Sequence, residues 1–557
     1  MAKHTVINSK STTSSQLNMM MNLRKPNHHS CNNNNSSNSK KINKSKGNNK
    51  RRIKINTTVI LFVAFGVVAI LVFLSVSVIT ITVPQQQQQI NNDYSLWKAT
   101  RQADLQLEAR QQQHRSSSSS KMTSNKDKTN KEPRYYMVFS TSCSPFQDWQ
   151  ALAFFHFAKK VNQPGNVTRL VSGCKDHQVE ALKKVHETII APLSPNFHLH
   201  FTPDFGVKDN QKYWNKPKSL LDYMETVMGF PTNAAAYNDD IIIILDPDMM
   251  LLRPITHVFD NYSKPDWVVP KNKTNKVVHG IPIAQAYGFG SGWLTSLKGN
   301  LSHVVGPHSP ALNVSLKDAN NYYPAGPPYL GTGKNMYDIA THWVKFLPRV
   351  HTIFPKFMAE MHAYSIAAAH LQLPHQLAKG FMLSDVTAHH QEAFGFLDNV
   401  TRQDACGGAN INIPVDKLPL VMHYCQRYAL GRWFFSKYKL REDFFDCDTP
   451  LLREPPTNVG TIYDWYIFPN GVEMKDYHKP DQHHNIVKNG WMLCVVLFSL
   501  NEVAIQIKTK HCDAAANFQK TLHFHDERMF EQSVNDPSNP FLITDEVERN
   551  KKLFLGI

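Results

Sequence analysis

The first 58 residues contain no Asp and no Glu, although they hold 12 of the 61 Lys and Arg residues. The formal charge of +16 is therefore concentrated at the N-terminus, because the rest of the chain has 49 basic against 45 acidic residues. A nucleic-acid-binding domain needs its basic charge within the folded part. We therefore expect no nucleic-acid partner. A basic nuclear factor is an alternative that only the N-terminal tail suggests.

Charge is also absent from Val59 to Val83, a run of 25 predominantly apolar residues. A helix of that length exceeds the roughly 30 Å of a hydrocarbon core. Basic residues precede the run and the flank from Pro84 has no early positive charge, which predicts a single transmembrane helix with a cytosolic N-terminus. Two alternatives are a signal peptide, whose apolar region is normally shorter, and a buried core helix.

Cysteine pairs with the spacing of a zinc site are absent, and seven of the eight cysteines follow the apolar run. An oxidising lumen permits disulfides there, and an odd number leaves at least one thiol over. The sequence predicts structural bridges without giving their connectivity. Six Asn-x-Ser/Thr sequons after the apolar run agree with a luminal glycoprotein, although Asn34, Asn35 and Asn56 begin sequons on the predicted cytosolic side. The six after the run begin at Asn166, Asn261, Asn272, Asn300, Asn313 and Asn399.

Low-complexity sequence surrounds the apolar run, and no internal repeat is present. Residues 1–58, rich in Asn, Ser and Lys, predict a disordered cytosolic tail, and residues 84–133 predict a luminal stem. We assign residues 134–475 to a globular domain and 476–557 to a C-terminal extension.

Strands and helices alternate from Arg134 onward. The predicted strands are Tyr135–Ser140, Val167–Ser172, Asp240–Leu245 and Leu418–Tyr424, and the predicted helices are Gln150–Lys160, Lys218–Met228 and Met358–Leu371. The DIIIIL run of the third strand is typical of a strand buried on both faces. This alternation predicts an α/β fold with a mostly parallel sheet.

Two carboxylates follow that buried strand in the sequence Leu245-Asp246-Pro247-Asp248. Pro247 favours an extended Asp246, so the side chains of Asp246 and Asp248 should share one face at the end of the sheet, where α/β proteins bind ligands. A divalent cation would relieve their repulsion and suits oxygen ligands. The alternative is a turn in which both aspartates are solvated or cap the next helix.

Three other segments add candidate ligands. Asn215 and Lys216 lie at a predicted helix start, whose free amides suit phosphate; the alternative is a plain exposed helix end. His423 ends a predicted strand and can complete a manganese-type site, although a histidine after an apolar run is more often structural. Lys437 can contact a diphosphate.

Five sequence blocks occur in the order seen in one known family. They are Val138–Cys174, Tyr213–Pro217, Ile242–Ile255, Met358–Ala369 and His423–Lys437. They resemble the hydroxyproline O-arabinosyltransferase-like glycosyltransferases of plants and algae, especially the peptidyl serine α-galactosyltransferase branch. The resemblance covers about Tyr135 to Pro456. Pro247 and Cys425 depart from the usual pattern of that branch, and these departures bear on the sugar rather than on the reaction class.

The resemblance implies a GT-A-type glycosyltransferase with a Rossmann-like nucleotide-sugar half, in which residues 134–475 form the catalytic domain. It implies a metal-dependent, retaining transfer of galactose or arabinose from a UDP-sugar to Ser or hydroxyproline of secreted or cell-wall proteins. The catalytic domain would be luminal, in a type II protein of the Golgi or endoplasmic reticulum membrane.

The family motifs also imply roles for individual residues. Asp246, Asp248 and His423 would hold Mn²⁺ or another divalent cation; Thr141, Asn215, Lys216, Asp246 and Lys437 would bind the donor; Glu360 and Asp248 would be catalytic. For Glu360 the alternative is an ordinary acidic residue at a helix N-terminus. The alternative function is a non-catalytic luminal lectin or scaffold, against which the intact metal-binding set argues.

Overall fold

The computed structural model describes residues 132–521, except 207–211, 260–266, 269–273, 298, 387, 389–391, 393, 407–412, 414, 431–432, 463–479 and 513–515. The described residues belong to one compact unit. The predicted cytosolic tail, the apolar run Val59–Val83 and the stem up to residue 131 lie outside the described residues.

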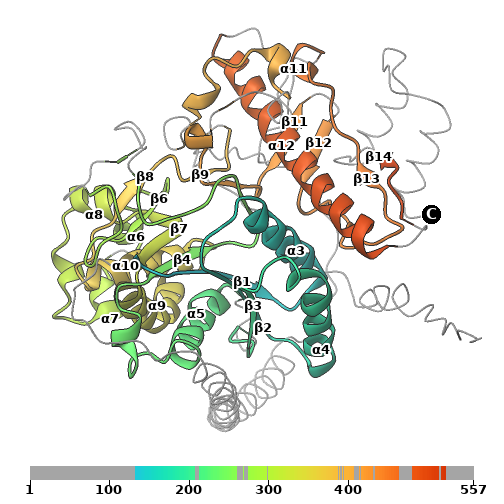
Figure 1. Cartoon of the computed structure of the whole chain (residues 1–557). Coiled ribbons are helices and arrows are strands. Elements are labelled where there is room, and N and C mark those ends of the chain that lie inside the picture. Colours follow the sequence, from blue (N-terminus) through green and yellow to red (C-terminus); the bar gives the residue numbers. More distant parts are fainter. Residues whose placement is uncertain are drawn as a thin grey trace, which may run out of the picture. The chain divides into compact units, whose positions relative to one another are not determined.

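A seven-stranded sheet forms the centre of this unit, in the order β3-β2-β1-β4-β7-β6-β8 (Figure 1). Its strands are β1 (Tyr135–Ser142), β2 (Asn166–Ser172), β3 (Phe197–Thr202), β4 (Ile241–Leu245), β6 (Ile283–Ala286), β7 (Ala325–Thr332) and β8 (Gln376–Ala378). In this sheet β7 is antiparallel to both neighbours and the other pairs are parallel. The predicted α/β fold with a mostly parallel sheet is confirmed.

Helices cover both faces of the sheet. One core contains residues of α5 (Asn215–Thr226), α9 (Gly333–Ile353) and α10 (Ala359–His370), together with Ile242 and Ile244 of β4. The other contains residues of α3 (Pro145–Lys160), together with Ile241, Ile243 and Leu245. Because alternate side chains of a strand point to opposite faces, β4 supplies both cores and is apolar throughout.

A second sheet joins the end of β4 to the C-terminal part of the chain. It consists of β5 (Met249–Leu251), β10 (Val421–His423) and β9 (Met382–Leu383). β5 and β10 are antiparallel, with Met249 opposite His423. This pairing brings the two distant segments of the predicted metal site side by side.

The C-terminal elements pack against that second sheet. β11 (Arg427–Leu430) and β12 (Trp433–Ser436) form an antiparallel hairpin, and α12 (Pro480–His511) lies across both strands. Tyr428 of the hairpin and Trp491 of α12 belong to the same core cluster as α3. The predicted extension from residue 476 therefore contributes α12 to the core, while its boundary stays a prediction.

The stretch Asn485–His511 of α12 is the one helix among the described residues that is long and apolar enough to cross a membrane. Its most apolar window is 72% buried inside the protein, as in the core helix of a soluble domain. Buried polar groups of α12 also have protein partners. The Asn501 Nδ2 donates to the Leu452 carbonyl at 2.6 Å, and Lys508 donates to the carbonyls of Asp446 and Thr449.

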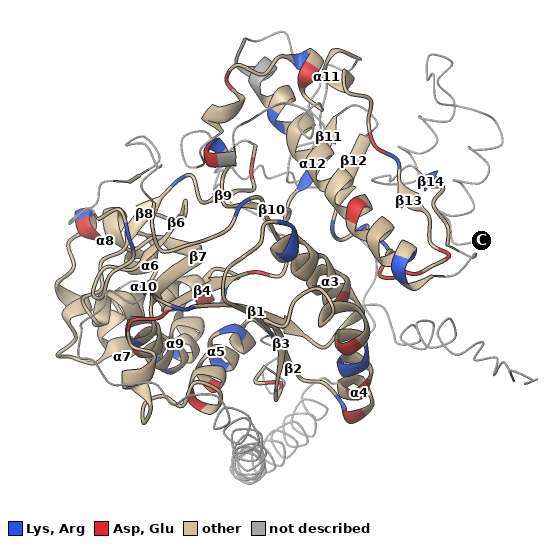
Figure 2. Ribbon diagram, viewed as in Figure 1, with Lys and Arg blue, Asp and Glu red and all other residues tan. Residues whose placement is uncertain are grey.

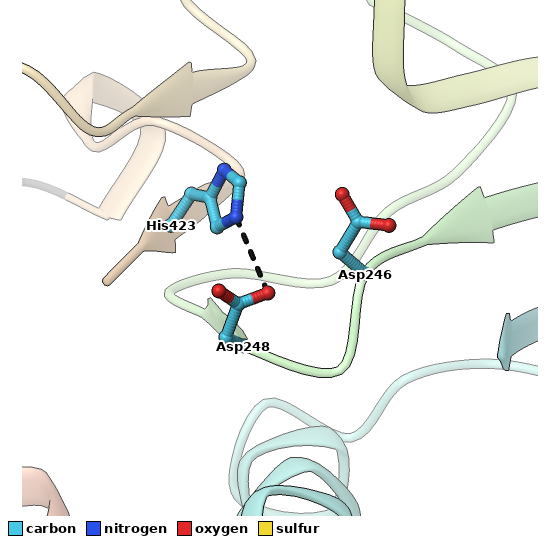
Figure 3. Close-up of side chains that lie close together, drawn as sticks. All are labelled: Asp246, Asp248 and His423. Atoms are coloured by element: carbon cyan, nitrogen blue, oxygen red, sulfur yellow. Dashed lines mark ion pairs between the residues drawn. The ribbon is translucent and has the colours of Figure 1, made fainter. Parts of the chain in front are cut away.

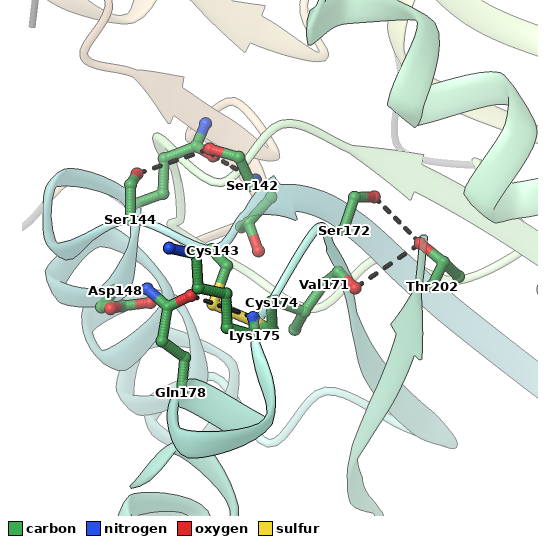
Figure 4. The surroundings of a disulfide bond; sticks show 12 residues. Ser142, Cys143, Ser144, Asp148, Val171, Ser172, Cys174, Lys175, Gln178 and Thr202 are labelled. Carbon is green, nitrogen blue, oxygen red and sulfur yellow. Dashed lines mark hydrogen bonds between the residues drawn. A yellow bond between two sulfur atoms is a disulfide. The ribbon is translucent and has the colours of Figure 1, made fainter. Parts of the chain in front are cut away.

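Three disulfides confirm the expected structural bridges and supply their connectivity: Cys143–Cys174, Cys406–Cys494 and Cys447–Cys512. The first joins the segments that directly follow β1 and β2 (Figure 4). The other two attach the middle of α12, at Cys494, and the residue that follows its last turn, Cys512, to the preceding chain. Cys425 is buried and stays outside these bridges.

Lys and Arg are interspersed with Asp and Glu over the described elements, as along α4 (Asp176–Val185) (Figure 2). This mixture matches the nearly balanced charge after residue 58. The predicted elements are present with shifted ends: the helix expected from Lys218 begins at Asn215, and the strand expected over Leu418–Tyr424 is shortened to Val421–His423.

Candidate metal and donor site

Asp246 and Asp248 lie in the turn between β4 and β5. The Met249 amide donates to the Asp246 carbonyl at 3.2 Å, which places Pro247 at the second position of a four-residue turn, where its fixed φ is favourable. The prediction of an extended Asp-Pro-Asp segment was wrong, because the chain reverses here into the second sheet. The predicted convergence of the two carboxylates is nevertheless found.

His423 reaches this turn from β10. Its Nε2 lies 3.2 Å from Asp248 Oδ1, and the Tyr424 amide donates to the Asp248 carbonyl at 3.1 Å. Figure 3 shows the three side chains converging from the turn and from β10. One ligand atom from each of Asp246, Asp248 and His423 lies within 4.8 Å of the others. Two carboxylates and one imidazole at this spacing suit a divalent cation such as Mn²⁺.

Each aspartate of this cluster also has a lysine partner. Lys437, which follows β12, forms an ion pair with Asp248, and Lys216 Nζ lies 2.7 Å from Asp246 Oδ1. Burial raises the pKa of Asp248, but Lys437 and His423 outweigh burial and hold that pKa far below its usual range. Burial lowers the pKa of His423, and Asp248 reverses this to a net increase. The expected repulsion between the two aspartates is thus compensated within the protein.

Glu360 extends the cluster on the other side of Lys216. It lies in the first turn of α10, and its Oε2 is 3.5 Å from Lys216 Nζ. The residue is only 6% exposed, and its Oε1 has no hydrogen-bond partner in the described part of the chain. Burial raises the pKa of Glu360 to about 7 in spite of Lys216. Near neutral pH this carboxyl group can therefore both give and take a proton.

Asn215 and Thr141, the two other predicted donor ligands, bond to different parts of the protein. Asn215 accepts from the Phe205 amide at 2.8 Å and donates to Asp204 at 3.0 Å. Thr141 accepts from Arg169 Nε at 2.9 Å. The structure thus brings six of the eight predicted residues together, while a donor role for Asn215 and Thr141 stays a prediction.

Tyr287 is a neighbour of the site that the sequence analysis missed. It follows β6, is half-buried, and its hydroxyl donates to Met382 Sδ at 3.6 Å. Burial and then the nearby Asp246 keep the pKa of Tyr287 well above 10, so its hydroxyl stays protonated. The ring packs on Gly326, where a Cβ atom would lie 2.0 Å from it. A single tyrosine after a short strand carries no sequence signal of this position.

No protein-family model matches this chain. Over 333 residues it is 25% identical to the peptidyl serine alpha-galactosyltransferase of Arabidopsis thaliana, a match that covers 58% of this chain and 34% of that protein. The chain thus spans about a third of the length of this relative. This relative belongs to the branch that the five sequence blocks resemble, so the match supports that resemblance.

Proposed function

We propose that this chain is a GT-A-type glycosyltransferase that transfers galactose from UDP-galactose to a serine of a protein. The observation that carries this proposal is the cluster of Asp246, Asp248 and His423 with Lys216 and Lys437 at the carboxyl end of β4. Such an edge is where α/β folds bind ligands, and a leaving diphosphate needs a concentration of cationic groups. The similarity to the Arabidopsis protein suggests the sugar and the acceptor.

Asp246, Asp248 and His423 would hold Mn²⁺ or another divalent cation. The donor set fits, because it combines two carboxylates with an imidazole whose ligand atoms lie within 4.8 Å of one another. A cation bound there would stabilise the negative charge of the leaving diphosphate. Lys216 and Lys437, which form ion pairs with Asp246 and Asp248 in the structure, would donate their ammonium groups to the phosphate oxygens of the bound donor.

The transfer would retain anomeric configuration, since an α-galactoside formed from α-linked UDP-galactose keeps the configuration of the donor. Retention calls for a protein group near the anomeric carbon on the side away from the leaving diphosphate. Glu360 is the candidate, because it is buried, ionisable near neutral pH and separated from Asp246 by a single lysine side chain. We assign it a contact with the donor sugar.

The catalytic domain would face the lumen of the Golgi or endoplasmic reticulum in a type II membrane protein. The apolar run Val59–Val83 and its basic flank support this topology. Three disulfides suit an oxidising compartment, and the sequon residues Asn313 and Asn399 are exposed, as glycan acceptors must be.

The proposal is tested on the full-length chain purified in detergent. The protein is incubated with UDP-galactose or UDP-arabinose, with or without Mn²⁺, and with peptides that carry Ser, hydroxyproline or Ala at one position. We expect a hexose mass increment on the Ser peptide, dependent on the metal ion and absent with Ala. A pentose on hydroxyproline would overturn the assigned sugar and acceptor, and binding without transfer would favour the lectin.

A further inference from the structure

A cavity of about 90 Å³ lies on the α3 side of the central sheet, apart from the metal and donor site. Its walls are mostly apolar and come from α3, α4, the turn that follows α4, the segment 442–446 and Ile507 of α12. The side chains used below are Leu152, Phe155, Leu182, Leu199 and Ile507. Leu152 and Leu199 are only half-buried, so the cavity is open to solvent at their end.

Acidic residues line one part of the cavity. Asp443 and Asp148 are each neutralised, by Arg441 and Arg169 respectively. Glu442 is exposed, and Asp446 has a buried Oδ2 without a hydrogen-bond partner in the described part of the chain. Glu442 and Asp446 therefore bring negative charge to this part of the cavity when they are ionised, although Lys508 and Arg441 act on Asp446 as cations.

Neighbouring carboxylates add to the pKa shifts that burial causes in both groups. Burial, followed by Asp443 and Asp448, raises the pKa of Asp446 to about 7, although Lys508 opposes the shift. Burial, followed by Asp148 and Asp443, raises the pKa of Glu442. A cation placed between Glu442 and Asp446 would therefore be attracted and would stabilise their ionised forms.

Trp149 connects the cavity with the metal and donor site. It lines the cavity, is 2% exposed, and its Nε1 has no hydrogen-bond partner among the described residues. Its ring stacks on that of Tyr424 with 6.1 Å between centroids. Tyr424 follows His423 directly, and its amide bonds to the Asp248 carbonyl. One pair of aromatic rings thus lies between the cavity and the predicted metal ligands.

We propose that this cavity binds the side chain of one Lys or Arg residue of the acceptor polypeptide, with the cation at Glu442 and Asp446. The proposal rests on the proposed function, whose acceptor it describes. The volume is below the roughly 150 Å³ that accommodates one benzene, so it suits a few methylene groups rather than a lipid or a nucleotide. Apolar walls with carboxylates at one end complement the aliphatic stem and charged head of such a side chain.

The test measures binding rather than transfer. Fluorescently labelled Ser peptides, with one Lys scanned over successive positions, are titrated with the full-length chain and compared with peptides that carry neutral norleucine instead. At the favoured position we expect Lys to bind about tenfold more tightly, the effect of ion pairs with two partly exposed carboxylates. The double variant Glu442→Gln/Asp446→Asn should reduce this ratio to near one. Leu182→Trp, which fills the cavity, should lower the binding affinity of both the Lys and the norleucine peptide.

The matched control is Glu180→Gln, which removes an exposed carboxylate of α4 paired with Lys183 and should leave the ratio unchanged. As a second measurement that needs no variant, added salt should lower the ratio for the wild-type chain. Equal affinity of Lys and norleucine at every position, or a ratio insensitive to salt and to the double variant, would overturn the cavity assignment. Galactose transfer to neutral Ser peptides would then still stand, whereas Lys-dependent binding without transfer would overturn only the proposed function.

Discussion

Two carboxyl groups at opposite ends of the same site have opposite protonation behaviour. Asp248 and Glu360 are both buried, at 4% and 6% exposure. Burial raises the pKa of Asp248, but Lys437 and His423 hold it far below its usual range, whereas burial raises the pKa of Glu360 to about 7. Asp248 has two cationic neighbours, while Glu360 shares the single ammonium group of Lys216 with Asp246.

The two groups are almost equally buried, so the number of neighbouring cations, rather than the depth of burial, sets the difference between their pKa values. A carboxylate that stays ionised at any physiological pH is suited to hold a metal cation. One that titrates near neutrality is suited to contact a reacting sugar or to move a proton. Substitutions at the two ends of the site should therefore have separable effects.

The largest effect is expected from Asp248→Asn. Loss of a charged ligand should reduce transfer by at least about 100-fold, since stabilisation of the leaving charge contributes several kcal/mol. Lys437 would also lose its partner, which should cost about 3 kcal/mol of folding free energy. The substitution should therefore not spare the fold, because each aspartate is paired with a lysine. Initial transfer rates and urea unfolding measure the two effects.

Asp240→Asn is the matched control at the other end of β4. Asp240 pairs with Arg134 at 2.7 Å, so its substitution should destabilise the protein while the transfer rate of the folded fraction is kept. Normal turnover of Asp248→Asn at saturating donor would exclude the metal role.

Glu360→Gln should change the pH dependence of stability. A folded-state pKa of about 7 against an ordinary value of 4.5 means that the folded protein binds more protons between these pH values. This contribution is present below pH 4.5 and is lost as the pH rises through 7, by about 3 kcal/mol in total. The variant should equal the wild type near pH 4 and be more stable at pH 8. Urea unfolding over this pH range measures the effect. Parallel curves of unfolding free energy against pH for the wild type and the variant would show that the pKa of Glu360 is not raised.

His423→Ala should weaken Mn²⁺ binding at least about tenfold, because a ligand is lost. In the wild type a proton competes with the metal for the imidazole, whose pKa Asp248 raises against burial in the metal-free protein. Mn²⁺ affinity should therefore fall as the pH drops through a range above 6.5, and the variant should lose this dependence. Mn²⁺ titration between about pH 5.5 and 8 tests this.

The matched control for His423 is His200→Ala. His200 also contacts a buried aspartate, with its Nε2 2.7 Å from Asp222 Oδ2, but lies on β3 away from the cluster. This variant should lose stability and keep the Mn²⁺ affinity and its pH dependence. Parallel pH curves for wild type and His423→Ala would leave Asp246 and Asp248 as the named metal ligands.

The smallest effect is expected from Asn215→Ala. Its two hydrogen bonds to Asp204 and to the Phe205 amide should contribute about 1–2 kcal/mol to the free energy of unfolding. UDP affinity, measured by calorimetry, should stay within about twofold, whereas Lys216→Met should lower it clearly. Weaker UDP binding at unchanged stability would instead support the donor role predicted for Asn215 from the family motifs.

Local sequence patterns were sufficient to predict single helices and strands and the residues at their ends. The apolar run of β4 and the Asp-Pro-Asp segment after it were recognisable because both depend on neighbouring residues. β7 was missed because its sequence, AGPPYLGT, contains two prolines and two glycines, although it pairs with β4 and β6 inside the sheet. α12 was missed because its apolar residues surround the helix, and only packing distinguishes such a helix from a membrane span.

The sequence by itself determined the α/β alternation, the position of the two aspartates at a strand end and the need for disulfides, since each follows from local spacing or composition. The tertiary structure alone decided which cysteines pair, that β10 places His423 beside Asp248, and that Lys216 is shared by Asp246 and Glu360. These contacts join residues far apart in the chain, and pKa values depend on such distances. The candidate residues could therefore be predicted from the sequence, whereas their pairing and their protonation states could not.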